Sequence, residues 1–72
     1  MKLPRNLSGL DVIRVLGRLG FRVIRQTGSH VRLAGRERLV TVPMHSAVAA
    51  GTLRNVIRQA GISLGEFLDA LR

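Results

Sequence analysis

Two short turn-forming segments divide the middle of the chain into three strand-like runs. Thr27-Gly28-Ser29 follows the first run, and Ala34-Gly35-Arg36-Glu37 follows the second. Connections this short cannot carry the chain back across a sheet for parallel pairing, so they favour an antiparallel meander. The pattern predicts a three-stranded antiparallel sheet built from residues 21–26, 30–33 and 39–42.

The facing of the second strand is better defined than that of the first. His30 and Arg32 alternate with two apolar residues, so they are expected on one face and the apolar pair on the other. In the first strand the β-branched residues Val23 and Ile24 are adjacent. Because this breaks the alternation, the facing of the first strand stays open.

Three helix-start signals lie outside the strands. Residues 8–11 and 63–66 have the serine-to-acid spacing of a capping box, and apolar residues follow each at helical spacing. Between them, Thr52 is the candidate N-cap of a helix that follows a loop over residues 44–51. The chain is therefore predicted to contain one helix before the strands and two after them.

The resulting order, α-β-β-β-α-α, predicts an α+β fold in which the sheet packs against helices. Three strands with an apolar face need such a cover to be stable. A chain of 72 residues is expected to form one domain over residues 1–72 with a modest core. It has no cysteine and no apolar run near the roughly 18 residues of a membrane span, so we expect a cytoplasmic protein without membrane association.

Positive charge dominates the composition. Lysine and arginine total 12 against 4 acidic residues, and all the basic residues except Lys2 are arginines. Between Arg14 and Arg38 only Glu37 offsets them. Because the arginine fork matches phosphate oxygens, this excess favours a nucleic-acid partner, although an acidic protein partner would also fit.

No known metal or phosphate motif is present. Two histidines and four scattered carboxylates match no zinc, magnesium or calcium pattern, and the glycines do not have P-loop spacing. A nucleophile elbow is also absent. We therefore expect no metal and no small-molecule cofactor, and any catalysis should depend on histidine.

RNA cleavage is a reaction that one histidine can support, because RNA supplies its own 2′-hydroxyl nucleophile. A histidine can act as base or acid, and arginines can stabilise the charge of the transition state. His30 is the candidate catalytic residue. Arg32 lies on the same strand face, and Arg22 or Arg25 could join from the neighbouring strand.

His45 is expected at the same end of the hairpin as His30. Counting residues places Thr41 nearer to the position opposite His30 and leaves about 13 Å of strand rise to His45. Substrate contact or loop anchoring therefore suits His45 better than a direct histidine pair. His30 itself could instead be a solvated or structural residue, which would leave a non-catalytic RNA- or DNA-binding module.

Four stretches, in this order and spacing, resemble the HicA (YcfA-like) toxins of bacterial toxin–antitoxin modules. They are residues 20–30, which end in Gly-Ser-His, residues 42–45 (Val-Pro-Met-His), residues 51–61, which begin Gly-Thr-Leu-Arg, and residues 66–68. The chain departs from the family at residues 47–50, where many members carry a charged loop and this chain has Ala-Val-Ala-Ala.

The resemblance implies a double-stranded-RNA-binding-domain-like fold and a metal-independent endoribonuclease that cleaves mRNA. It also implies a HicB-type antitoxin partner that covers the active site. The family's catalytic histidine falls on His30. The residues expected to contact RNA are Arg22, Arg25, Gly28, Ser29, Arg32 and His45. Since tryptophan and tyrosine are absent, these contacts should be mainly to phosphate and sugar.

Overall fold

The computed structural model describes residues 3–72 and confirms the predicted α+β fold. Three helices and three strands follow the order α-β-β-β-α-α, and the strands form one antiparallel sheet in the order β1-β2-β3. The elements are α1 (Gly9–Arg18), β1 (Arg22–Thr27), β2 (His30–Gly35), β3 (Arg38–Pro43), α2 (Ala50–Ala60) and α3 (Leu64–Leu71).

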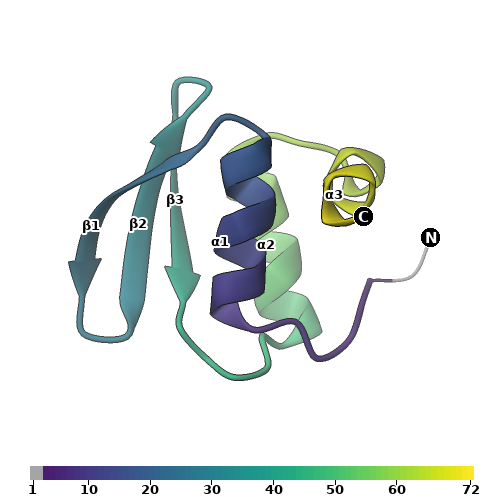
Figure 1. The fold of residues 1–72 in the computed structure, drawn as a ribbon, viewed down its shortest axis with the longest axis horizontal. Coiled ribbons are helices and arrows are strands. Elements are labelled where there is room, and N and C mark those ends of the chain that lie inside the picture. Colours follow the sequence, from purple (N-terminus) through teal and green to yellow (C-terminus); the bar gives the residue numbers. More distant parts are fainter. Residues whose placement is uncertain (1–2) are drawn as a thin grey trace.

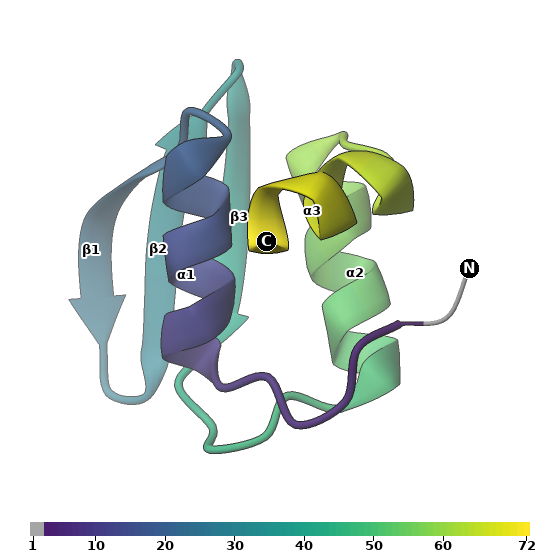
Figure 2. The ribbon, with the colours of Figure 1, turned by 45° about the vertical axis from the view of Figure 1, so that its right-hand side comes forward.

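The helices lie on one side of the sheet. Figures 1 and 2 show α1 and α2 against one face, with α3 beyond them and the opposite face of the sheet uncovered. The core between sheet and helices includes the fully buried side chains of Val12, Leu16, Leu33, Val40, Leu53 and Phe67. Within residues 3–72, none of the helices is both long and apolar enough to cross a membrane.

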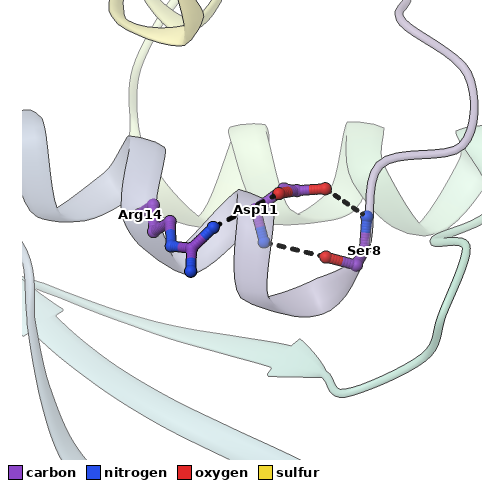
Figure 3. Close-up of polar contacts among 3 residues, drawn as sticks. All are labelled: Ser8, Asp11 and Arg14. Atoms are coloured by element: carbon purple, nitrogen blue, oxygen red, sulfur yellow. Dashed lines mark hydrogen bonds and ion pairs between the residues drawn. The ribbon is translucent and has the colours of Figure 1, made fainter.

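The predicted capping box at the start of α1 is confirmed (Figure 3). The Ser8 hydroxyl accepts a hydrogen bond from the Asp11 amide, and the Asp11 carboxylate accepts one from the Ser8 amide, each at 3.0 Å. These hydrogen bonds, helped by nearby Arg14, lower the pKa of Asp11. The serine of the second predicted box is confirmed as a cap too, since the Ser63 hydroxyl accepts from the Glu66 amide at 3.0 Å.

The first residue of α1 packs directly against the end of β3. The Gly9 amide donates to the His45 carbonyl at 2.9 Å, and Gly9 is buried. A Cβ at this position would collide with the Pro43 carbonyl oxygen and lie 2.9 Å from the Met44 Cα. Only glycine fits here, and the close approach fixes the loop that follows β3.

The predicted start of α2 is wrong. The helix begins at Ala50 with Ala49 as N-cap and no capping side chain, so Thr52 lies inside its first turn. The cause is a tertiary contact: Val48 is buried, and its amide donates to the Leu7 carbonyl at 2.7 Å. The loop is therefore anchored earlier than the local sequence indicates.

The predicted register between the second and third strands is also wrong. His30 pairs with Pro43, and Thr41 pairs with Arg32. The turn is two residues rather than four, because Arg36 and Glu37 adopt left-handed φ values of 50° and 61° and leave both strands longer. Positive φ at both central residues is the pattern of a type I′ hairpin turn.

An ion pair holds this turn against α3. Arg36 Nη2 lies 2.7 Å from Glu66 Oε2. The hydrogen bond from the guanidinium lowers the pKa of Glu66. The pair thus links the β2–β3 turn to the first turn of α3.

Strand β1 contains a bulge that resolves its facing. Val23 pairs with Leu33 and Arg25 pairs with Arg32, so Ile24 has no partner on β2. An extra residue of this kind shifts the alternation by one position. The adjacent Val23 and Ile24, which left the facing open in the sequence, are therefore the two residues at the irregularity.

Candidate active site on the uncovered face of the sheet

The face of the sheet opposite α1 and α2, here called the outer face, carries the candidate site. The strand register sorts its residues into three rows across the strands. These rows are Thr27, His30 and Pro43 at the β1–β2 turn; Arg25, Arg32 and Thr41 in the middle; and Arg22, Ala34 and Leu39 at the β2–β3 turn. Directly opposite residues in such rows have Cβ atoms about 5 Å apart.

The bulge at Ile24 brings two predicted arginines onto this face. In a regular strand, Arg22 and Arg25 would point to opposite faces because they are three positions apart. With Ile24 unpaired, Arg22 lies opposite Ala34 and Arg25 opposite Arg32. Both arginines therefore share a face with His30.

A hollow of about 240 Å³ joins the first two rows. It is lined by Arg25, Thr27, His30, Arg32 and Thr41. His30 and both arginines are exposed, and Thr41 is half-buried. The predicted face of the second strand is thus confirmed, and the structure brings His30, Arg25 and Arg32 together.

The arginines of the outer face are not used in ion pairs within the part of the chain that the structure describes. Within residues 3–72, Arg22, Arg25 and Arg32 form no ion pair and no side-chain hydrogen bond. Arg25 and Arg32 are directly opposite each other, an arrangement that destabilises a sheet. Such a face favours an anionic ligand that neutralises it.

Other arginines are used within the fold. Arg18 donates to the Ala70 carbonyl at 2.6 Å and so connects α1 to the end of α3, while Arg36 pairs with Glu66. The arginine excess noted in the sequence therefore includes both arginines that hold the fold together and an unpaired group on the same face as His30.

The turn between β1 and β2 positions His30 without lining the hollow. Gly28 has φ +58°, and Ser29 is not among the residues with positive φ, which is the pattern of a type II′ turn. The Ser29 carbonyl accepts from the Met44 amide at 2.6 Å. Gly28 and Ser29 therefore fix the start of β2, and their contact with RNA stays a prediction.

His45 lies outside this hollow. It follows Pro43, the strand partner of His30, by two residues, so the corrected register places it nearer to His30 than the predicted one. Its backbone carbonyl is held by the Gly9 amide, and its side chain is exposed. The backbone of His45 anchors the loop, and an RNA contact by its imidazole stays a prediction.

Sequence reasoning missed the two threonines of the hollow. Thr27 is two positions after Arg25, so regular alternation puts both side chains on the same face of the sheet. Thr27 could therefore have been predicted from the sequence. Thr41 could not be found without the register of β3. Its amide donates to the Gln59 side chain at 3.0 Å, which ties this part of the site to α2.

Metal-ligating side chains do not gather in the part of the chain that the structure describes. Within residues 3–72, no three histidine or carboxylate side chains come close enough to hold an ion. The groups available for chemistry in the hollow are one imidazole, two guanidinium groups and two hydroxyls.

Comparison with known protein families matches residues 9–62, more than half of the chain, to the HicA toxin of bacterial toxin–antitoxin systems. The chain belongs to the HicA toxin family. No curated protein matches it. The match to HicA begins at the first residue of α1 and ends just after α2, so it includes the whole sheet and every residue of the hollow. The HicA assignment makes this chain the toxin of a toxin–antitoxin system.

Proposed function

We propose that this HicA-family toxin is an endoribonuclease that cleaves mRNA in the cytoplasm without a metal ion. His30 transfers protons, and Arg25 and Arg32 bind the phosphate that is attacked. A HicB-type antitoxin suppresses the activity by covering the outer face of the sheet.

One observation carries this proposal: two unneutralised arginines face each other across the hollow that His30 lines. Like charges at opposing positions cost stability, so a purely structural sheet would gain from replacing one of them. A phosphate between the two guanidinium groups would neutralise both. A phosphate bound there would lie beside the imidazole of His30.

The chemistry needs few groups because RNA contains the nucleophile. The 2′-oxygen loses its proton and attacks the adjacent phosphorus, and the bond from phosphorus to the 5′-oxygen breaks. The products are a 2′,3′-cyclic phosphate and a 5′-hydroxyl. His30 would take the 2′-proton or supply the proton of the leaving 5′-oxygen, while the arginines stabilise the charge that builds on the phosphoryl oxygens.

The antitoxin proposal follows from charge and exposure. The chain has net charge +8, and the arginines beside His30 are open to solvent. A partner that presents carboxylates to this face would pair with the same groups that hold RNA. RNA and antitoxin should therefore compete for one surface.

The test of the proposed function is cleavage of a structureless RNA by the purified chain in buffer that contains EDTA. We expect products that end in a 2′,3′-cyclic phosphate, identified by mass spectrometry, and no loss of rate with chelator. Salt-sensitive binding with the RNA recovered intact would instead identify a non-catalytic binding module. Absence of both cleavage and binding would leave the antitoxin as the only partner of this face.

Arg25→Gln should weaken RNA binding and at the same time stabilise the fold. Losing one phosphate contact should make the slope of log affinity against log salt less steep by about 0.7. Removing the repulsion with Arg32 should raise the unfolding free energy by about 0.5 kcal/mol. Fluorescence anisotropy across a salt series and urea denaturation measure the two effects.

The matched control is Arg14→Gln, because Arg14 is an exposed arginine on α1, away from the outer face. It should leave the salt slope nearly unchanged. An Arg25→Gln protein with wild-type RNA affinity and slope would contradict a phosphate contact at this position.

A further inference from the structure

A second hollow lies on the outer face at the β2–β3 turn. It measures about 350 Å³, and its lining includes Ala34, Glu37 and Leu39 together with three arginines, Arg22, Arg36 and Arg38. Ala34 is four residues along β2 from His30, which corresponds to about 13 Å of strand rise. If one phosphate of an RNA strand lies at the first hollow, a nearby nucleotide of the same strand would reach the second hollow.

This hollow has an apolar side that the first one lacks. Leu39 is 54% exposed, one of the most exposed large apolar side chains, and Ala34 beside it is half-buried. Apolar surface next to the exposed guanidinium of Arg22 suits the flat face of a nucleobase.

Glu37 gives the hollow an acceptor. Within residues 3–72, the other three carboxylates form ion pairs and Glu37 forms none. Of its two arginine neighbours, Arg36 is paired with Glu66, and Arg38 forms no ion pair within residues 3–72. A free carboxylate on a face that binds phosphate would repel the ligand, unless the carboxylate itself contacts a hydrogen-bond donor of that ligand.

RNA offers hydrogen-bond donors on its 2′-hydroxyl groups and on its bases, and only the bases can present two donor groups side by side. An ionised carboxylate only accepts hydrogen bonds, through two oxygens side by side. The Watson–Crick edge of guanine presents two neighbouring donors, N1–H and the N2 amino group, whereas adenine and cytosine offer only an amino group and uracil only N3–H. A carboxylate therefore matches guanine best.

We propose that this hollow at the β2–β3 turn is a nucleobase subsite in which Glu37 recognises guanine. The inference rests on the proposed function, because it requires RNA on the outer face. It adds base recognition at one nucleotide to binding that otherwise depends on phosphate and sugar.

Binding of 2′-O-methyl oligonucleotides tests this subsite separately from cleavage, since the methyl group blocks the nucleophile. The probes are an all-uridine 12-mer and the same 12-mer with one central guanosine, adenosine or cytidine, measured by fluorescence anisotropy. The wild-type chain should bind the guanosine probe about tenfold more tightly than the uridine probe. Glu37→Gln should lose most of this preference and bind the uridine probe at least as tightly as the wild type does.

Asp69→Asn is the matched control, because it removes the same charge from an exposed residue of α3. It should keep the guanosine preference. Equal affinity of the wild type for all four probes, or equal tightening of all four by Glu37→Gln, would overturn the subsite and leave Glu37 a surface charge. RNA cleavage could still occur in that case. Failure to bind any probe at low salt would overturn the RNA interface and the subsite together.

Discussion

The His30→Ala protein is expected to leave RNA intact under conditions in which the wild type cleaves it. General acid–base catalysis by one side chain contributes roughly 100- to 10,000-fold to a rate, so the cleavage rate should fall by about this factor. His30 is exposed, so its removal should leave no buried cavity. Induced expression in a bacterial host should therefore yield abundant soluble protein without growth arrest, with intact mRNA on a gel.

The matched control is His45→Ala, which removes an exposed imidazole outside the hollow. It should reduce cleavage far less than His30→Ala. Affinity of the His30→Ala protein for a 2′-O-methyl oligonucleotide should stay close to that of the wild type, since the arginines proposed to hold phosphate are unchanged. Undiminished growth arrest by His30→Ala would exclude His30 as the proton-transfer residue.

Gly9→Ala should destabilise the fold by about 3 kcal/mol, a large fraction of the stability of so small a domain. The added methyl group would meet the Pro43 carbonyl oxygen and the Met44 Cα, and both are backbone atoms that cannot rotate away. Either α1 or the end of β3 must shift, and the hydrogen bond from the Gly9 amide to the His45 carbonyl weakens with it. Urea denaturation followed by circular dichroism measures the loss.

Gly17→Ala provides the control within the same helix. Gly17 is exposed, and a Cβ there would meet no atom within 4 Å. Because alanine favours a helix interior over glycine, this variant should gain about 1 kcal/mol. If Gly9→Ala were as stable as the wild type, the close approach of α1 to the end of β3 would not exist in solution.

The elements of the fold could be predicted because their signals are local. Ser8 and Ser63 cap their helices through residues three positions away, and the Gly28-Ser29 turn is flanked by strand-forming residues. The alternation after His30 placed it on the same face as Arg32. These predictions depend on a few neighbouring residues, and nothing elsewhere in the chain overrides them.

The errors concern features set by distant contacts. The register of β3 depends on positive φ at Arg36 and Glu37, which is uncommon for residues other than glycine, and the ion pair from Arg36 to Glu66 braces that turn. The start of α2 depends on the hydrogen bond from Val48 to Leu7. Without these contacts, counting residues along the sequence places Thr41 opposite His30, whereas its partner is Arg32.

The unpaired residue of β1 makes the charge of the outer face depend on how the strand pairs as well as on composition. Deleting Ile24 would leave Arg22 and Arg25 two positions apart in a regular strand, so both would keep their present partners and stay on the outer face. If the unchanged sequence paired without the bulge, one of these two arginines would turn toward the helices. In a gene for a toxin, a one-codon deletion at Ile24 would therefore shorten the strand and spare the proposed phosphate-binding surface, whereas a change that removed the bulge at constant length would lose part of it.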